Sequence, residues 1–485
     1  MAANRKRTKI VATLGPACST KEIIENMMES GVNVFRVNFS HADYTDVEER
    51  VKIIREINKR RNFHVAVLAD LQGPKLRVGV MEEGVTLEIG DTFTFTTDEC
   101  IGTKEKAFMT YQKFPKDVEA GEHILVDDGK LMFEVIDTDR DKNVVTKVLR
   151  GGDLKSKKGV NLPNTKISLP ALTKKDRKDV IFAISLDVDW IALSFVRTPE
   201  DLMELQEIIK ENSNHKIPIV AKIEKPEAVA NIDRLTPHCD ALMCARGDLG
   251  VEVPMEKVPL IQKRLVLKAK KAHIPIIIAT QMMETMIDNQ VPTRAEVNDV
   301  ANSIMDGADA VMLSGETSVG KFPLEVIQQM RKIIESVENS PLISPPDEYV
   351  QCINDRFISK TICHQASIMA KSIDAEVITT LTDSGFTAFH ISSWRPEANI
   401  LVFSSNRRIL AMLNLLWGVK GVYYDRFVST DQTIEDINNL AHEKGYLNNG
   451  DYAINITSMP VKARGMANTM RITEYEVPEQ RFIAL

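Results

Sequence analysis

The sequence predicts a (β/α)₈ barrel with a small all-β lid domain inserted after its third strand and an open α/β domain at its C-terminus. Eight short apolar runs, each followed by an amphipathic helical pattern except where the insertion intervenes, indicate parallel strands that are buried on both faces. Eight such units are the number that closes a barrel. An open doubly wound sheet is the structural alternative, but no G-x-G-x-x-G follows the first run.

The strands and helices of the barrel follow one another from near the N-terminus. The first strand leads to a helix that opens at Ser19-Thr20, with Glu22 in its first turn as capping favours. A charged helix covers about residues 44–60, and the last barrel helix ends near Glu338. We expect the eight strands at residues 8–15, 33–40, 64–71, 189–196, 217–224, 240–247, 274–281 and 309–316.

Two further regions differ from the barrel pattern. The stretches "GVTLEIGDTFTFTTD" and "GKLMFEVID" alternate apolar and polar residues between Gly, Asp and Asn, which indicates a small β-barrel lid. The Pro-rich "ENSPLISPPDEY" then marks a domain boundary. We assign residues 1–72 and 170–340 to the barrel, 73–169 to the inserted lid, and 350–485 to a C-terminal α/β domain for oligomer or effector contacts.

Composition excludes several classes of function. The chain of 485 residues is 44% hydrophobic and 27% charged, with a net charge of −7, which argues against a nucleic-acid binder. No apolar run approaches the ~18 residues that span a bilayer, so we expect no membrane partner. Six cysteines without a C-x-x-C are typical of free thiols in a reducing compartment, and we expect a cytoplasmic protein.

Polar side chains gather where the predicted strands end. The active site of a (β/α)₈ barrel lies at the carboxyl ends of its strands, whereas the other ends of these strands begin with ordinary residues such as Ile217-Pro218. This asymmetry predicts a site at one barrel mouth. The strand-end residues are Arg36, Asn38, Ser40, Asp70, Ser194, Arg197, Lys222, Glu224, Arg246, Gly247, Asp248, Thr280, Gln281, Ser314 and Glu316.

Lys222 and Glu224 leave the same face of one strand because side chains alternate across it. A half-solvated ion pair of little consequence is the plain interpretation of the two alone. Glu224 and Asp248 on adjacent strands would suit a hard cation such as Mg²⁺ or Mn²⁺, while Lys222, Arg36 and Arg77 would supply positive charge for a phosphoryl group. These parts indicate phosphoryl transfer; an aldolase- or mutase-like barrel acting on a 2-oxo acid enolate is the alternative.

The chain resembles the pyruvate kinase family in long blocks that follow one another along essentially its whole length. These blocks are "TKIVATLGPA", "FRVNFSHA", "DLQGPKLRVG", "VDDGK", "SKKGVNLP", "AKIEKPEAV", "ARGDLGVEVP", "ATQMMETM", "PTRAEVNDVANSIMDGADAVMLSGETSVGKFP" and "NTMRI".

The resemblance implies transfer of the phosphoryl group of phosphoenolpyruvate to ADP, giving ATP and pyruvate, in a homotetramer. It implies that Glu224 and Asp248 bind Mg²⁺ or Mn²⁺ and that Lys222 stabilises charge on the phosphoryl group and the enolate oxygen. Arg36 would contact the phosphate, Gly247 and Asp248 the substrate carboxylate through their N–H groups, and Thr280 would lie near the methylene carbon. The implied nucleotide contacts are Asn38, Phe39, Ser40, His41, Arg77 and Lys158.

Some of these candidate site residues, and the barrel as a whole, have alternative interpretations. Ser194, Arg197, Ser314 and Glu316 are expected to orient the ligands rather than touch substrate. Lys158, beside Lys157, could be a solvated charge. A catalytically silent barrel that senses phosphorylated metabolites is the non-enzymatic alternative, although it would be expected to lose Lys222 or a metal carboxylate.

One departure from the family pattern concerns K⁺. Members that need K⁺ usually carry an acidic residue where this chain has Lys75, and a Thr after the strand-three Asp, where it has Leu71-Gln72. We expect the Lys75 ammonium to replace the ion near Asp70, Asn38 and Ser40, so that K⁺ is not required, because the two cations would repel. The alternative is that Lys75 points to solvent. The cation-site pattern and its substitute comprise Asn38, Ser40, Asp70, Leu71 and Lys75.

The C-terminal domain holds a hydroxyl-rich loop, "TLTDSGFTA", before a predicted helix. It resembles the family's effector-phosphate loop, and a loop at a helix N-terminus suits an anion. Asp383 and Phe386 occupy places that are often basic, so a silent structural turn is the alternative. The candidate phosphate residues are Thr382, Ser384, Gly385 and Thr387.

Overall fold

The barrel predicted from the sequence is present in a computed structural model that describes residues 6–40, 42–163, 165–340, 356–426, 429–459 and 467–477. Eight parallel strands pair in the closed order β1-β2-β3-β13-β14-β15-β16-β17, and β17 returns to β1. The strands are β1 (Lys9–Thr13), β2 (Val34–Asn38), β3 (Ala66–Asp70), β13 (Trp190–Leu193), β14 (Ile219–Ile223), β15 (Ala241–Ala245), β16 (Ile276–Ala279) and β17 (Ala310–Leu313).

Helices surround the strands and bury their apolar faces against them. The first helix shows why the elements form where they do: Thr20 caps its N-terminus by accepting a hydrogen bond from Ile23 N, and Gly31 ends it with φ +119°. The barrel helices are α1 (Lys21–Ser30), α2 (Tyr44–Arg61), α4 (Lys174–Ser185), α5 (Pro199–Asn212), α6 (Pro226–Ala230), α7 (Ile232–Leu235), α8 (Arg246–Glu252), α9 (Val258–Ala272), α10 (Arg294–Asp306), α11 (Gly315–Ser318) and α12 (Pro323–Glu338).

The lid is a curled seven-stranded sheet with a separate two-stranded ladder. Its edge strands meet through a bridge between Val78 and Met109, supported by a 2.8 Å hydrogen bond from Gly79 N to Phe108 O. The sheet therefore bends round on itself as a small barrel. Its elements are β4 (Leu76–Arg77), β5 (Thr86–Leu87), β6 (Thr92–Thr96), β7 (Lys106–Phe108), α3 (Phe114–Asp117), β8 (His123–Val126), β9 (Leu131–Thr138), β10 (Asn143–Arg150), β11 (Gly152–Asp153) and β12 (Gly159–Asn161).

The C-terminal domain is an α/β sheet in the order β20-β19-β18-β21-β22, parallel except for its last strand. Its elements are α13 (Phe357–Ser372), β18 (Val377–Leu381), α14 (Phe386–Ser393), β19 (Asn399–Ser404), α15 (Arg407–Leu413), β20 (Val419–Tyr423), α16 (Thr430–Glu443), β21 (Tyr452–Thr457) and β22 (Thr469–Glu474).

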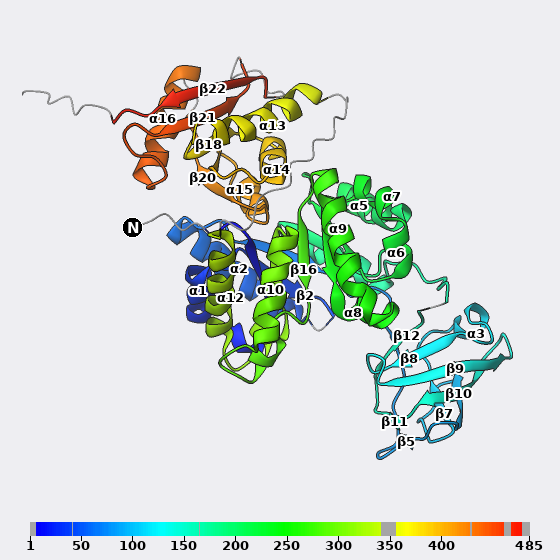
Figure 1. Cartoon of the computed structure of the whole chain (residues 1–485). Helices are drawn as coiled ribbons and strands as arrows, with labels where there is room; N and C mark the ends of the chain where they lie inside the picture. Colours follow the sequence, from blue (N-terminus) through cyan, green and yellow to red (C-terminus); the bar gives the residue numbers. More distant parts are fainter. Residues whose placement is uncertain are drawn as a thin grey trace, which may run out of the picture.

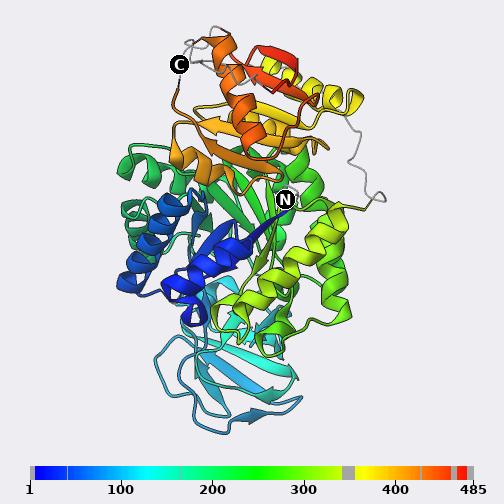
Figure 2. The same ribbon diagram turned by 90° about the vertical axis from the view of Figure 1, so that its left-hand side faces the viewer.

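The barrel lies between the other two domains, with the lid at one end and the C-terminal domain at the other (Figure 1, Figure 2). Leu415 of the C-terminal domain joins the apolar cluster that fills the barrel interior. Trp190 Nε1, at the start of β13, donates to Met412 O at 3.1 Å. The C-terminal domain thus closes the amino ends of the strands, and the carboxyl ends face the lid.

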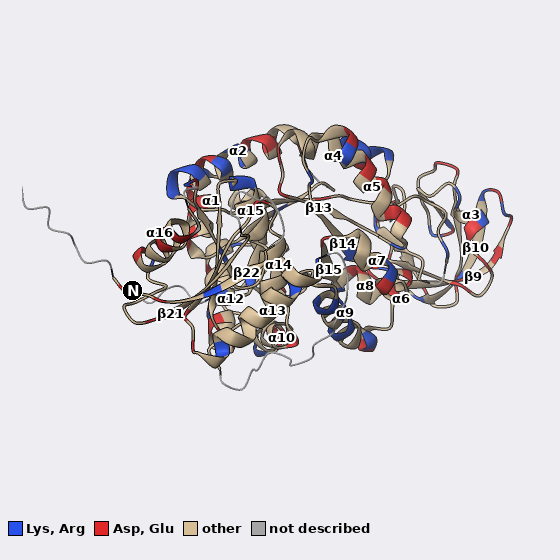
Figure 3. Cartoon of the chain, turned by 90° about the horizontal axis from the view of Figure 1, so that it is seen from above, with Lys and Arg blue, Asp and Glu red and all other residues tan. Residues whose placement is uncertain are grey.

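Positively and negatively charged residues occur together on the outer helices, for example α2 and α4 (Figure 3). Within the part of the chain that the structure describes, no helix has the length and apolar character needed to cross a membrane.

Candidate active site

The predicted residues at the ends of the barrel strands come together at the barrel end that faces the lid. Each lies at or just after the carboxyl end of a strand, as the sequence led us to expect. Arg36 and Asn38 belong to β2, Asp70 ends β3, Ser194 follows β13, Lys222 and Glu224 lie at the end of β14, Asp248 follows β15, Thr280 follows β16, and Ser314 and Glu316 follow β17.

Lys222 is the centre of a buried charged cluster. Its Nζ lies 2.6 Å from Ser194 Oγ, 2.9 Å from Glu224 Oε1 and 3.1 Å from Asp70 Oδ1. Burial alone would lower the pKa of the ammonium, but Asp70 and Glu224 raise it above its ordinary value. Lys222 therefore stays charged, and the Lys222–Glu224 pair is part of a buried cluster rather than a half-solvated surface pair.

Arg36 contributes a second cation to the same cluster. Its Nε donates to Asp70 Oδ2 at 2.6 Å, and its Nη1 donates to Thr13 Oγ1 at 3.1 Å. Burial would raise the pKa of the Asp70 carboxyl, yet Lys222 and Arg36 outweigh it and hold the pKa below its ordinary value. Asp70 is thus ionised and fixes two cations at the barrel mouth.

Glu224 has the surroundings expected of a metal ligand. Its Oε2 accepts a 2.7 Å hydrogen bond from Phe195 N, while its buried Oε1, close to Lys222 Nζ, has no hydrogen bond of good geometry. Burial raises the pKa of Glu224, and the nearby Asp248 adds to this while Lys222 opposes it. A divalent cation between Glu224 and Asp248 would complete the bonding of Oε1 and offset the repulsion of the two carboxylates, so these residues fit the group.

The remaining ligands of such a cation would have to come from elsewhere. Among the described residues, no cluster of three or more His, Cys, Asp or Glu side chains could hold a metal. A site with two protein carboxylates leaves positions for water and substrate oxygens, as Mg²⁺ prefers.

Thr280 is held in an unusual backbone conformation. Its φ is +70°, and that of Gln281 is +55°, a left-handed region that few residues other than glycine adopt. Such conformations cluster at functional sites. Arg246 supports the turn, because its Nη2 donates to Thr280 O at 2.9 Å while the guanidinium pairs with Asp299 at 2.7 Å.

Gly247 was expected to offer its N–H to a substrate carboxylate. In the structure this N–H donates to Thr280 Oγ1 at 2.7 Å, and Thr280 Oγ1 in turn donates to Ala279 O at 2.5 Å. The Gly247 donor is therefore occupied, and it becomes available only when the Thr280 side chain turns away.

Two of the expected nucleotide residues lie side by side on the lid. Arg77 in β4 pairs in register with Gly159, the neighbour of Lys158. Arg77 Nη1 donates to Lys157 O at 2.9 Å, and Lys158 Nζ lies 2.9 Å from Asp127 Oδ1. Both cations are partly exposed, Arg77 on β4 and Lys158 just before β12.

The other expected nucleotide residues follow β2. Asn38 Oδ1 accepts a hydrogen bond from Ser40 N at 3.2 Å, which shapes the turn. Phe39 is buried and its carbonyl accepts from Lys175 Nζ at 2.7 Å, so only its backbone could face a nucleotide. His41 lies outside the described residues.

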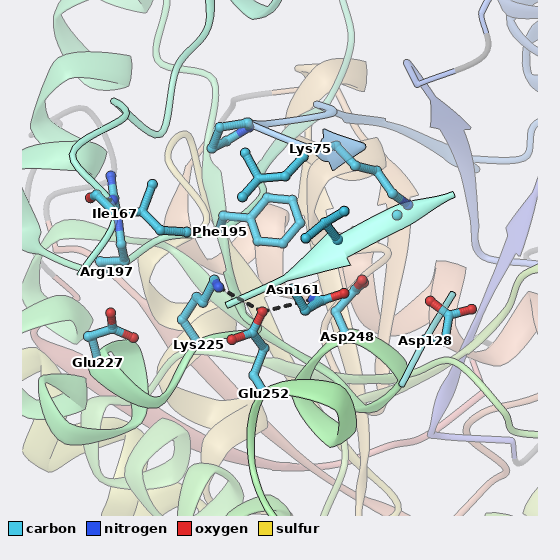
Figure 4. A pocket seen from close by; sticks show the side chains of 14 residues that line it. Lys75, Asp128, Asn161, Ile167, Phe195, Arg197, Lys225, Glu227, Asp248 and Glu252 are labelled. Carbon is cyan, nitrogen blue, oxygen red and sulfur yellow. Dashed lines mark hydrogen bonds and ion pairs between the residues drawn. The ribbon is translucent and has the colours of Figure 1, made fainter. Parts of the chain in front are cut away.

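We expected Lys75 to lie beside Asp70, but it does not. It is exposed on the lid side of the hinge after Pro74, with its Cε next to Gly159, and both Asp70 oxygens are bound by Lys222 and Arg36 instead. Lys75 does line the pocket between lid and barrel that also contains Asp248 (Figure 4). The position of the Lys75 side chain depends on the lid hinge, which the sequence pattern could not show.

Sequence reasoning missed a contact that joins the lid to the barrel. Glu252 Oε1 accepts from Lys225 Nζ at 2.7 Å and from Asn161 Nδ2 of the lid at 2.8 Å (Figure 4). We call these three residues the lid bridge. Lys225 and Glu252 look like surface charges in the sequence, yet both are buried; the only signal was their closeness to Glu224 and Asp248.

Arg197 and Glu316, which were expected to orient the ligands, make their contacts with the backbone of nearby loops. Arg197 donates to the carbonyls of Ile167 and Leu169 at 2.7 and 2.6 Å, and so fixes the segment that returns from the lid. Glu316 accepts hydrogen bonds from Ser314 N at 2.6 Å and Met283 N at 3.3 Å. These side chains hold loops at the barrel mouth in place.

Comparison with known proteins agrees with this geometry. The family model for the pyruvate kinase barrel domain matches residues 5–327, and the model for the pyruvate kinase alpha/beta domain matches residues 360–473. The chain belongs to the pyruvate kinase family. It is therefore a phosphotransferase of glycolysis, and the fold predicted from the sequence is confirmed.

Individual pyruvate kinases are similar over nearly the whole chain. One from Bacillus licheniformis is 41% identical over 96% of this chain and 80% of its own length. One from Corynebacterium glutamicum is 40% identical over 96% of this chain and 97% of its own. The crystal structure of a pyruvate kinase from Cryptosporidium parvum covers 97% of this chain and 96% of its own, with a TM-score of 0.89 and 34% identity.

The loop that resembles the effector site of pyruvate kinases is internally bonded. Thr382 Oγ1 accepts from Gly385 N at 2.9 Å, and Thr387 Oγ1 accepts from Thr380 Oγ1 at 3.1 Å. Ser384 Oγ accepts a long 3.5 Å bond from Phe386 N. Thr382 and Thr387 are buried, so their hydroxyls serve the turn, and phosphate binding here stays a prediction.

Proposed function

We propose that the chain transfers the phosphoryl group of phosphoenolpyruvate to ADP, giving pyruvate and ATP, with Mg²⁺ or Mn²⁺ held by Glu224 and Asp248. The single observation that carries this proposal is the buried cluster of Lys222, Glu224 and Asp70, which keeps a charged ammonium beside an incompletely bonded carboxylate. Such a cluster suits a reaction in which negative charge moves between oxygens.

The side chains have distinct parts in this reaction. Lys222 stays charged and neutralises the phosphoryl oxygens and the developing enolate, because Asp70 and Glu224 hold its proton. Arg36, which Asp70 and Thr13 hold in place, would contact the phosphate. When bound, the divalent cation supplies further positive charge to the substrate oxygens. Thr280 orders the segment beside the methylene carbon, and Arg77 and Lys158 bring positive charge from the lid to the nucleotide phosphates.

The proposal is tested by measuring pyruvate formation from phosphoenolpyruvate and Mg·ADP, and Mn²⁺ binding by electron paramagnetic resonance. We expect activity that is abolished by EDTA, and a Glu224→Gln variant that binds Mn²⁺ at least about tenfold more weakly. Glu227→Gln is the matched control, because Glu227 lines the pocket that contains Asp248 but is no proposed ligand. Activity that survives EDTA, or equal Mn²⁺ binding by both variants, would overturn the metal assignment.

We also propose that K⁺ is not required. Lys222 and Arg36 already bind both oxygens of Asp70, and residue 75 at the lid hinge is a lysine, which offers no carboxylate to a further cation. The test compares activity in K⁺-free buffer with activity after K⁺ is added. We expect little change for the natural chain and a K⁺ requirement in Lys75→Glu, with Lys75→Gln as the control that removes charge without adding an acid. A natural chain that is active only with K⁺ would refute the proposal.

The assembly and location that we propose are a homotetramer in the cytoplasm. They are supported by membership of the family and by the free cysteines among the described residues. Sedimentation velocity would test the tetramer, since its mass is four times the 54.4 kDa of the chain.

A further inference from the structure

Two segments of the chain join the lid to the barrel, and both reach the same helix end. The outgoing segment lies between β3 and β4, and the returning segment lies between β12 and α4. Asp176, in the first turn of α4, is fully buried and bonds to both segments. One carboxylate therefore holds both connections between the lid and the barrel.

Each oxygen of the Asp176 carboxylate binds one of these segments. Its Oδ1 accepts a 3.1 Å hydrogen bond from Gly73 N of the outgoing segment. Its Oδ2 accepts from Thr173 N at 2.9 Å and from Thr173 Oγ1 at 2.5 Å in the returning segment. The Thr173 bonds are those of a capping box, for which one carboxylate oxygen is enough. The bond to Gly73, which lies 103 positions away in the chain, is not needed for a helix cap.

Gly73 is also packed against the residues that follow β13. Its φ is +68°, and a Cβ at this position would lie 2.8 Å from Phe195 Cδ2 and 3.1 Å from Ser194 Cβ. Those two residues also contact the buried charged cluster around Lys222. The outgoing segment is therefore held between Asp176 and the residues that support the cluster, where a side chain on residue 73 would not fit.

The neighbouring residue of the same helix turn holds part of the barrel. Lys175 Nζ donates to Phe39 O at 2.7 Å and to Asp179 Oδ2 at 2.5 Å. Asp179 also accepts from Tyr44 Oη at 2.6 Å, and the Tyr44 ring stacks on Phe182 with centroids 4.0 Å apart. These contacts fix the turn between β2 and α2, which carries the proposed nucleotide residues of the barrel.

The two halves of the proposed nucleotide site are thus held from one helix end. Arg77 and Lys158 belong to the lid, whereas Asn38 and Ser40 belong to the barrel. Accurate alignment of such groups matters, because a misplacement of about 1 Å can lower a rate about 10²-fold.

We propose that the first turn of α4 aligns the lid and barrel halves of the nucleotide site, with Asp176 fixing the lid hinge and Lys175 fixing the turn after β2. Both act through other residues, which makes them positioning residues. This inference rests on the proposed function, because it assigns the aligned surfaces to ADP. Loss of either contact should affect ADP far more than phosphoenolpyruvate, whose proposed contacts Arg36 and Lys222 lie on barrel strands.

Steady-state kinetics of the full chain test the alignment. Asp176→Asn, which removes one of the two carboxylate acceptors, and Lys175→Met should each raise the KM for Mg·ADP about 3–10-fold, the effect of one hydrogen bond. The KM for phosphoenolpyruvate and the binding of Mn²⁺ should change less than about twofold, because the barrel contacts are intact.

Two matched controls separate alignment from helix capping and from surface charge. Glu296→Gln makes the same carboxylate-to-amide change in the capping box of α10. Lys174→Met removes the charge of the exposed neighbour of Lys175. Both variants should keep the KM for Mg·ADP of the natural chain. If Asp176→Asn fails to fold, Lys175→Met still tests the alignment.

Hydrogen exchange measured by mass spectrometry tests the hinge without any activity. In Asp176→Asn the amides around Gly73 or around Thr173, whichever segment loses its acceptor, should exchange at least about threefold faster than in the natural chain. Amides of β14 and β15 should exchange at the natural rate. If the natural chain makes no pyruvate, the proposed function fails, whereas this measurement still decides whether Asp176 holds the hinge.

Three results would overturn the proposal. One is a KM for Mg·ADP that is equal in Asp176→Asn, Lys175→Met and the two controls. Another is an equal rise in the KM values for Mg·ADP and phosphoenolpyruvate, which would show a general disturbance of the barrel mouth. The third is unchanged hydrogen exchange at both connecting segments of Asp176→Asn.

Discussion

Lys222 shows how a single residue can serve both stability and chemistry. It is buried against two carboxylates and a hydroxyl, so its charge is held in place before substrate arrives. Positive charge that needs no rearrangement during the reaction is the strongest kind of electrostatic catalysis. The same arrangement makes the site sensitive to any loss of that charge.

Replacement of the ammonium by an apolar group should affect both properties. We expect Lys222→Met to lower kcat by about 10³-fold or more and to lower the free energy of unfolding by about 3–5 kcal/mol, because Asp70 and Glu224 lose their shared cation. Steady-state kinetics and urea denaturation measure the two effects. A variant with kcat within tenfold of the natural value would contradict the role of Lys222.

Thr280 offers a test of the segment at the methylene carbon. Thr280→Val keeps the shape but removes the acceptor of the Gly247 N–H, whereas Thr280→Ser keeps the hydroxyl. We expect kcat to fall about 10–100-fold for Val and far less for Ser, with a smaller change in KM for phosphoenolpyruvate. Thr285→Val, outside the site, is the control. Equal activity of the Val and Ser variants would show that the hydroxyl has no part.

Much of the site could be predicted from the sequence because strand ends were visible as apolar runs followed by charged residues. The barrel topology then brings these ends together, which is why Lys222, Glu224, Asp70 and Arg36 meet as expected. Lys75 was placed wrongly, because its side-chain direction depends on the lid hinge and not on a strand period. Only the structure shows that Thr280 occupies the Gly247 N–H.

At the scale of elements, the lid bridge ties two domains at one point. Asn161 ends β12 just before the chain returns to the barrel, and its amide reaches Glu252 at the end of α8. Glu252 follows Asp248 in the same helix, so the bridge links the lid position to a proposed metal ligand. Sequence patterns do not reveal such a contact, because its three members lie in separate segments.

Removing the Asn161 amide, the part of the bridge that belongs to the lid, should weaken nucleotide binding. We expect Asn161→Ala to raise the KM for ADP about 2–10-fold, the effect of one hydrogen bond, because the lid carries Arg77 and Lys158. The unfolding midpoint should change little. Asn143→Ala, which disturbs a loop of the lid far from the barrel contact, is the matched control. If both variants have the same KM, the bridge does not position the lid.

At the scale of the whole molecule, three histidines lie where the C-terminal domain meets the barrel, His390 buried and His64 and His273 half-buried. The rings of His273 and His390 are in contact, tilted by 56° with centroids 4.7 Å apart, and His64 lies next to Gly421. Burial lowers the pKa of His64 and His273 to about 4 and that of His390 to about 3, and nearby cations such as Arg407 and Lys360 add to this. All three are neutral in the folded chain at pH 7.

Lowering the pH should therefore lower the free energy of unfolding. In the unfolded chain these histidines take up protons below about pH 6.5, whereas in the folded chain they stay neutral to about pH 4. Their full contribution to the free energy of unfolding is therefore present above about pH 6.5 and is lost as the pH falls toward about 4. Each histidine should cost about 2 kcal/mol at pH 5 relative to pH 7. Urea denaturation at the two pH values measures the loss, and His390→Phe should lose about 2 kcal/mol less than the natural chain. An equal loss in both would show that His390 is not the cause.

The most direct test of the account follows the phosphoryl group itself. Phosphorus NMR of the protein with phosphoenolpyruvate, ADP and Mg²⁺ in K⁺-free buffer should show the phosphoenolpyruvate signal falling as the γ-phosphate signal of ATP grows in equal amount. In the Lys222→Met variant both changes should be much slower than in the natural chain. A phosphoenolpyruvate signal that stays constant, or that is converted to inorganic phosphate without ATP, would contradict phosphoryl transfer to ADP at this site.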